Sequence, residues 1–365
     1  MSTRLVLEDG SVFEGEPFGS REAAIGEVVF NTSMTGYQEI ATDPSYRFQI
    51  VVMTYPHQGN YGIESIAEQS ETPQVAGFAV RELTPPAAHP DASLGLEEYF
   101  VRHGVPAIHG IDTRALTRKL RMHGSMMGMI VNDDRPVDQV ISELRAAPSM
   151  AGLDLVQRVT VAEPYELAAE GDVRRRIAVY DFGVKRDILK RLQLEGCAVS
   201  VFPAKTPARE ILSRNFGGVL LSNGPGDPEP VSYAQQNIRE MIGRVPLLGI
   251  CLGHQLLGLA LGGKTYKLKF GHHGGNHPVK ELDSGRVEIT AQNHGFAVDG
   301  DTLPSSEIEF THVNLNDGTI EGFRSKKDPI IAVQYHPEAA PGPHDSFYVF
   351  SDFLRMIDEQ QTRQP

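Results

Sequence analysis

The chain has 365 residues, 40% of them hydrophobic, a length that suggests two domains rather than one. Its 47 acidic residues outnumber 34 basic ones and give a formal net charge of −13, so nucleic acid and anionic membranes would repel its surface on average. Only two cysteines occur, Cys197 and Cys251, far apart in the sequence, which argues against a disulfide framework and predicts a reducing, cytoplasmic setting.

Residues 1–150 predict an N-terminal, β-rich α/β domain. The opening residues MSTRLVLEDG have no apolar core, which predicts no secretory signal. Alternating or continuous apolar residues predict a hairpin and three strands, at residues 4–15, 26–30, 49–54 and 126–131. Between the second and third of these, NTSMTGYQEIATDPSY is rich in Ser, Thr, Asn and Gly and predicts a loop, where Ser33 is most simply a turn hydroxyl. Helices are predicted from Asp112-Thr113 to about Met122 and at residues 137–146.

Residues 151–173 predict a linker, and residues 174–365 a second domain with strands and helices in alternation. The predicted strands cover residues 177–180, 197–202, 218–221, 245–250, 307–315, 319–324 and 330–335. The predicted helices cover residues 184–195, a segment opening at Thr206-Pro207, and residues 233–242, 252–261 and 346–358. Such alternation indicates a doubly wound, mostly parallel sheet, in which ligands bind beyond the carboxyl ends of the strands.

The stretch from Val245 to Gly263 has the features of a nucleophile elbow. Cys251 stands between a predicted strand and a predicted helix, with Gly249 and Gly253 on either side where the turn must be sharp. The helix dipole and free N–H groups at that position favour a thiolate. Two alternatives compete: Cys251 as a small buried hydrophobic residue, and the whole stretch as a membrane span, against which its proline, its glycines and the pair His254-Gln255 argue.

A thiol nucleophile needs a base, and the base needs a group that orients it. His336 directly follows a predicted core strand, and Glu338, two residues further, faces the same side of an extended backbone. The loop SNGPGDP follows the strand before the elbow, and its Gly224 and Gly226 allow close backbone approach, with an N–H at Gly226 for an oxyanion. It lacks the Gly-Lys-Ser/Thr ending of a phosphate-binding P-loop.

The histidine-rich run Phe270–His277 matches no metal-binding pattern, so no metal is predicted in this chain. A glycine-rich loop that shapes the mouth of a pocket or contacts a partner is the expectation for this run.

The motifs GICLGHQ, SNGPGDP and His336-Pro337-Glu338 together resemble those of class I, or triad-type, glutamine amidotransferases. The resemblance implies that Cys251 attacks the glutamine amide, releases ammonia and forms a γ-glutamyl thioester, with His336 and Glu338 completing the catalytic set. It also implies an oxyanion hole from the backbone N–H groups of Gly226 and Leu252.

A longer series of motifs resembles the small, glutamine-hydrolysing subunit of carbamoyl-phosphate synthetases over nearly the whole chain: VFNTSMTGYQEI, TDPSY, TYPHQGNYG, IDTRALTRKLR, KFGHHGGNHPV, AQNHGFAVD and APGPHD. One departure is Tyr335, where the family often has glycine before the histidine. The glutamine contacts implied by this resemblance are Ser33, Gly224, Gly226, Leu252, Gln255, Asn293, Gly295 and Phe296.

The same resemblance implies a partner: a separate large subunit that uses two ATP, Mg²⁺ and bicarbonate to make carbamoyl phosphate, receiving ammonia through a tunnel. No cofactor is then expected in this chain, which has no P-loop or ATP-grasp signature. The basic helix from Arg114 to Arg121 is the candidate contact face, and the heterodimer could assemble further. Whether the product serves arginine or pyrimidine synthesis is left open.

Three alternative functions compete with this interpretation. The chain could be a glutaminase component of anthranilate, GMP or CTP synthesis, against which its N-terminal half argues. It could be an inactive regulatory subunit, against which the presence of Cys251, His336 and Glu338 argues. It could also be a γ-glutamyl hydrolase that acts without a partner.

Overall fold

The computed structural model describes residues 3–85 and 89–363 and divides the chain into two compact units. The first unit comprises Met1–Leu153 and Lys269–Gly274, and the second comprises Asp154–Leu268 and Gly275–Pro365. Most of the segment predicted as a linker, residues 154–173, lies in the second unit. No helix in the part of the chain that the structure describes is both long and apolar enough to span a membrane.

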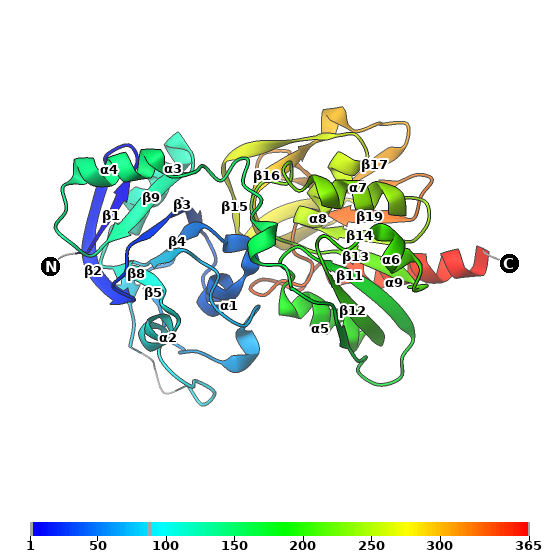
Figure 1. Cartoon of the computed structure of the whole chain (residues 1–365), viewed down its shortest axis with the longest axis horizontal. Coiled ribbons are helices and arrows are strands. Elements are labelled where there is room, and N and C mark those ends of the chain that lie inside the picture. Colours follow the sequence, from blue (N-terminus) through cyan, green and yellow to red (C-terminus); the bar gives the residue numbers. More distant parts are fainter. Residues whose placement is uncertain (1–2, 86–88, 364–365) are drawn as a thin grey trace. The chain divides into compact units, whose positions relative to one another are not determined.

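The first unit is built on a closed barrel with the strand order β1-β2-β8-β6-β4-β3-β9 (Figure 1). Its strands are β1 (Thr3–Leu7), β2 (Val12–Gly19), β3 (Ala24–Asn31), β4 (Gln49–Met53), β6 (Gly77–Ala79), β8 (Pro106–His109) and β9 (Met126–Val131). The helices α2 (Leu96–His103), α3 (Thr113–His123) and α4 (Val137–Ala146) also belong to it, with a short parallel pair, β5 (His57–Gln58) and β7 (Glu82–Leu83). The predicted hairpin is confirmed by the antiparallel pairing of β1 with β2.

The stretch predicted as a loop after β3 is in part helical, so that prediction was wrong there. It contains α1 (Tyr37–Thr42) and a short 3-10 helix (Pro44–Tyr46). Tyr37, Ile40 and Ala41 are buried and pack in one apolar cluster with the barrel. Burial of these side chains, worth about 1.5–3 kcal/mol for a large one, outweighs the local preference of Ser, Thr and Gly for a turn.

The second unit contains a ten-stranded sheet with the order β10-β12-β11-β13-β14-β19-β18-β17-β15-β16. Five strands at its centre pair in parallel: β11 (Arg175–Asp181), β12 (Cys197–Pro203), β13 (Gly218–Leu221), β14 (Leu247–Ile250) and β19 (Ile330–Val333). The remaining strands extend the sheet on both sides: β10 (Tyr165–Leu167), β15 (Lys264–Glu281), β16 (Val287–Asp299), β17 (Ile308–Asn314) and β18 (Ile320–Ser325). The predicted parallel sheet is thereby confirmed, with antiparallel additions.

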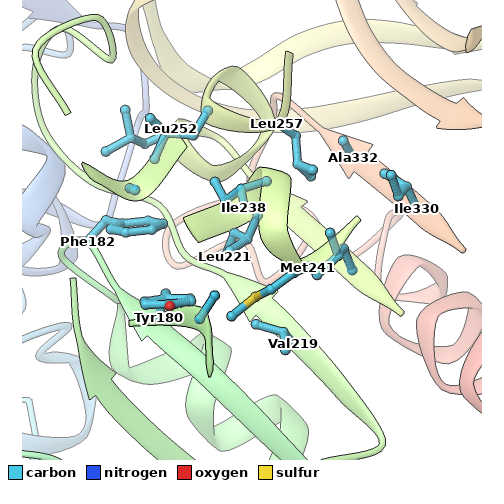
Figure 2. Close-up of a cluster of buried hydrophobic side chains, with 14 of the residues drawn as sticks. Tyr180, Phe182, Val219, Leu221, Ile238, Met241, Leu252, Leu257, Ile330 and Ala332 are labelled. Atoms are coloured by element: carbon cyan, nitrogen blue, oxygen red, sulfur yellow. The ribbon is translucent and has the colours of Figure 1, made fainter. Parts of the chain in front are cut away.

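Helices cover both faces of this sheet (Figure 1). One face packs against α6 (Ala208–Leu212), α7 (Ser232–Met241) and α8 (Leu252–Ala260), and the other against α5 (Arg186–Leu194) and α9 (Tyr348–Arg363). Figure 2 shows the first of these cores, where Ile238 and Met241 of α7 and Leu252 and Leu257 of α8 meet Leu221 of β13. This packing fixes α8, and with it the turn that precedes α8.

The run Phe270–His277 lies inside the long strand β15, so its prediction as a glycine-rich loop was wrong. Within the first unit, the carbonyl of Lys269 accepts from Ser125 N at 2.8 Å, and that of His273 accepts from Thr32 N at 3.1 Å. Glycine has little preference for a strand, but backbone hydrogen bonds to neighbouring segments hold the run extended.

Candidate active site

Cys251 occupies a strained turn between β14 and α8. Its backbone has φ 53° and ψ −104°, which non-glycine residues rarely adopt and which costs about 1–3 kcal/mol. The turn is held on both sides: Cys251 N donates to Val333 O at 2.9 Å, and Gln255 N donates to Cys251 O at 3.1 Å. The sulfur is therefore fixed where β14 ends and α8 begins.

The two glycines beside Cys251 are required by close backbone approach. A Cβ on Gly253 would lie 2.1 Å from Leu221 O, and one on Gly249 would lie 2.8 Å from Gly253 O. Gly224 is equally confined, since its Cβ would lie 2.2 Å from Phe182 O and 2.8 Å from a methyl carbon of Leu252. The loop SNGPGDP thus packs directly against the start of α8.

His336 and Glu338 follow β19, the strand next to β14 in the sheet. Both side chains are buried, and His336 Nδ1 lies 2.6 Å from Glu338 Oε1. The backbone of His336 is anchored as well, because its N–H donates to Ala291 O at 2.9 Å. Nε2 makes no hydrogen bond of normal geometry within the described residues.

A buried lysine completes this set of charges. Lys185 Nζ lies 2.9 Å from Glu338 Oε1 and donates to Ala339 O at 2.6 Å. Its side chain is 2% exposed and that of Glu338 is 1% exposed, so neither charge is offset by bulk water. Each is stabilised by the other, as a buried charge requires.

These neighbours set the protonation states of Glu338 and His336. Burial alone would raise the pKa of Glu338, but the charges of Lys185 and His336 outweigh it and lower this pKa to about 2. Burial alone would lower the pKa of His336, yet the Glu338 carboxylate raises it to about 10, with Lys185 opposing and Cys251 adding to the rise. His336 therefore holds a proton at neutral pH, next to the Cys251 sulfur.

The second unit brings most of the remaining candidate residues close to Cys251. The sulfur lies 3.6 Å from its acceptor Asn293 O, and Gln255 Nε2 donates to Phe296 O at 2.7 Å. Leu252 is the first residue of α8, so its N–H has no partner within the helix. Gly226 has φ 83°, and Gly295 lies between Asn293 and Phe296 on β16, with open space where a Cβ would be.

Ser33 is not among the residues that the second unit brings together. It lies in the first unit, where its N–H donates to Asn31 Oδ1 at 2.7 Å. Its hydroxyl is buried and makes no hydrogen bond within the described residues.

Sequence reasoning missed Lys185 and Gln334. Lys185 is the N-cap residue of α5, at the end of the turn that follows β11, on the edge where ligands bind in such sheets, and that position was the available signal. Gln334 accepts a hydrogen bond from Gln255 Nε2 at 3.1 Å. The two residues are far apart in the sequence, so no local pattern predicts this contact.

Comparison with known proteins gives two family matches. Residues 178–356 match the class-I glutamine amidotransferase family, and residues 5–130 match the CPSase domain of the carbamoyl-phosphate synthase small chain.

Curated relatives extend the similarity over the full length. The chain is 50% identical to the carbamoyl phosphate synthase small chain of Syntrophotalea carbinolica, over 100% of both chains. It is 51% identical to that of Methanopyrus kandleri, over 98% of this chain and 100% of the relative. With the chloroplastic small chain of Oryza sativa subsp. japonica it shares 47% identity, over 97% of this chain and 82% of the relative.

These matches cover both units, including the barrel, and they agree with the cysteine elbow of the second unit. The chain therefore belongs to the family of carbamoyl phosphate synthase small chains, with a class I glutamine amidotransferase domain.

Proposed function

We propose that this chain hydrolyses glutamine at Cys251 and delivers the ammonia to a large subunit that makes carbamoyl phosphate. The observation that carries the proposal is the strained Cys251 beside a protonated His336, which is itself paired with the Glu338 carboxylate. An ordinary buried cysteine needs neither the backbone strain nor the buried charges.

The first half of the reaction forms a thioester. The Cys251 thiolate attacks the carboxamide carbon, and the oxyanion accepts hydrogen bonds from the N–H groups of Leu252 and Gly226. The tetrahedral intermediate collapses as the carbon–nitrogen bond breaks, and His336 gives its proton to the leaving nitrogen. Ammonia leaves and the γ-glutamyl group stays on sulfur.

The second half restores the enzyme. Neutral His336 takes a proton from water, whose oxygen attacks the thioester carbon, and the carbon–sulfur bond then breaks. Glutamate leaves, and the thiolate–imidazolium pair is formed again. Glu338 stays ionised throughout, because its pKa is held near 2, and it stabilises the protonated ring.

Glutamine itself would be held by the residues that the family resemblance implies: Ser33, Gly224, Gly226, Leu252, Gln255, Asn293, Gly295 and Phe296. The burial of Gln255 and its fixed amide support this for the second unit. Ser33 is supported by its buried hydroxyl, which is available to accept or donate.

The partner would be the large subunit of a carbamoyl-phosphate synthetase, which uses ATP and Mg²⁺. Helix α3 of the first unit is the candidate contact face, because Arg114, Arg118 and Arg121 are exposed along it while Leu116 and Leu120 are buried. Lys119 is already paired with Asp9 at 2.6 Å, which leaves the arginines as the cations to test.

The contact face is tested by reversing charge on α3. In a pull-down with the large subunit, R118E/R121E is expected to weaken binding, and the loss should shrink at high salt, where surface charges are screened. Binding by R118E/R121E equal to that of the unaltered chain at every salt concentration would contradict this role for α3.

The hydrolysis is tested with Cys251→Ser in the assembled complex. Glutamine-dependent carbamoyl phosphate synthesis is expected to fall at least 1,000-fold, since the hydroxyl is a far weaker nucleophile, while synthesis from added ammonia continues. The matched control is Cys197→Ser, which alters the other buried cysteine, in β12. Glutamine use by the Cys251→Ser complex at the normal rate would overturn the assignment.

A further inference from the structure

Next to the catalytic set lies a buried group of two amides and one histidine, of which the proposed function uses only Gln255. Gln255 and His254 are neighbours on α8, and Gln334 lies two residues before His336. His254 and Gln334 are each 0% exposed, and Gln255 is 2% exposed. Three polar side chains are therefore enclosed in protein, where each unmade hydrogen bond costs about 1–3 kcal/mol.

The amide of Gln255 has only one orientation consistent with its neighbours. Its Nε2 donates to Phe296 O at 2.7 Å and to Gln334 Oε1 at 3.1 Å, which uses both of its N–H groups. A backbone carbonyl can only accept, so turning the amide over would place two oxygens against each other. The oxygen of Gln255 is thereby the atom left for an incoming molecule.

His254 is the third member of this buried group. Its ring packs on the Phe323 ring, with centroids 4.8 Å apart, and neither ring nitrogen makes a hydrogen bond of normal geometry within the described residues. Burial lowers the pKa of His254 to about 3, against an interaction with the Gln334 side chain, while His312 adds to the lowering. The ring is therefore neutral at physiological pH and places a polar group next to Gln334 without adding charge to the site.

An apolar side chain could pack on Phe323 without burying two ring nitrogens, so packing alone does not explain His254. The same holds for Gln334, whose backbone is already fixed by the hydrogen bond from its N–H to Glu321 O at 2.8 Å. What the two side chains share is a link to Gln255: Gln334 contacts it directly, and His254 interacts with Gln334.

We propose that Gln334, supported by His254, is a positioning residue that fixes the Gln255 amide so that bound glutamine meets its oxygen. This rests on the proposed function, in which Gln255 contacts the substrate. The Gln255 oxygen would accept a hydrogen bond from an N–H group of glutamine, and a Gln255 amide that turned freely would offer that oxygen only part of the time. The result expected is weaker binding of glutamine, with little effect on the step at the sulfur.

The test is a double-mutant cycle in the assembled complex, with kcat and KM for glutamine as readouts. Gln334→Met keeps the length of the side chain but removes its amide, and we expect KM to rise about 3- to 10-fold, the loss of one hydrogen bond, with kcat within about twofold. In a Gln255→Met background, Gln334→Met should raise KM no further, because it acts only through Gln255.

His254→Phe is the second variant, which keeps the ring on Phe323 and removes both nitrogens. We expect KM to rise about 2- to 3-fold, again only while Gln255 is present. Asn237→Leu is the matched control: its amide joins α7 to residues 206 and 208, away from Gln255, and its loss should lower stability without changing KM. Stability is followed separately by thermal unfolding of each variant.

An unchanged KM in both Gln334→Met and His254→Phe would overturn the inference, as would a rise in KM of equal size with and without Gln255. Neither result would contradict the proposed function. The proposed function is tested separately, and glutamine use by the Cys251→Ser complex would contradict it.

Discussion

The two ends of the central parallel strands in the second unit differ sharply. At the carboxyl ends lie the strained Cys251, two further residues with positive φ (Ala339 and Ala340) and the buried charges of Lys185 and Glu338. At the amino ends lies a hollow of about 280 Å³, lined by apolar residues such as Ile211, Val245 and Ile357 and by polar residues that include the exposed Arg244.

Backbone strain and buried charge are thus concentrated at one end of the parallel strands. Backbone strain and buried charge both oppose folding, so they persist only where the surrounding packing holds them, and they are typical of functional sites. The amino ends use apolar side chains, and among the described residues there the one non-glycine residue with positive φ is Asn215, a residue type that adopts this conformation more readily than most. Substitutions at the carboxyl ends should therefore change glutamine hydrolysis, whereas substitutions at the amino ends should change only stability.

The largest expected effect on stability and activity comes from adding a methyl group at the carboxyl ends, compared with the same change at the amino ends. Gly253→Ala would place a Cβ 2.1 Å from Leu221 O, a backbone atom that cannot move aside, and we expect a loss of about 4 kcal/mol or more in the free energy of unfolding, together with loss of glutamine hydrolysis. Gly217→Ala is the matched control, since the nearest atom to its Cβ would be a side-chain methyl carbon of Ile357 at 3.2 Å, and the nearest backbone atom, Arg176 O, would lie 3.5 Å away. Urea denaturation should show a change within about 1 kcal/mol for Gly217→Ala, and equal losses for the two variants would break the comparison.

A smaller but more informative effect is expected from Lys185→Met, which removes one buried charge. We expect a loss of about 3 kcal/mol, because Glu338 loses a partner that no water replaces. The pKa of Glu338 is lowered by Lys185, so this pKa should rise in the variant. The pKa of His336, which Lys185 lowers, should rise as well.

The pH dependence follows from these directions. Glu338 contributes stability that is complete above its ordinary pKa and is lost as pH falls toward about 2, so in Lys185→Met the acid loss should be smaller and should end at a higher pH. His336 contributes stability that is complete below its ordinary pKa and is lost as pH rises toward about 10, so the alkaline loss should also move upward. Thermal unfolding across pH would show both shifts, and an acid limb that did not move would argue against the Lys185–Glu338 pair.

The smallest effect is expected at the apolar end. Ile357→Val in α9 removes one buried methyl group and should cost about 1 kcal/mol, measured by urea denaturation. The rate of glutamine hydrolysis should stay the same, because Ile357 lies among the lining residues of the hollow at the amino ends. A drop in that rate out of proportion to the stability loss would mean that the two ends are coupled.

Features that depend on local sequence were predictable. The elbow around Cys251 depends on five consecutive residues. The helix cap at Asp112, whose carboxylate accepts from Ala115 N, is local as well. The two central contributions that the sequence did not reveal are not local. Lys185 owes its role to Glu338, far along the chain, and the strand at Phe270–His277 owes its conformation to hydrogen bonds with segments such as residues 32 and 125.

The helix Tyr37–Thr42 illustrates the same limit on a smaller scale. Its composition favoured a turn, and only the apolar cluster around Tyr37 and Ile40 gives it a reason to be helical. For the site, the sequence predicted Cys251, His336 and Glu338, whereas their buried neighbours Lys185 and Gln334 came only with the fold.

In the proposed reaction, the Cys251 sulfur carries the γ-glutamyl group during turnover. The most direct measurement is rapid acid quenching of the complex with glutamine, followed by mass spectrometry of the peptide that contains Cys251. We expect a γ-glutamyl adduct on that peptide, and no adduct in Cys251→Ser. An adduct on another residue, or steady glutamine hydrolysis by Cys251→Ser, would contradict it.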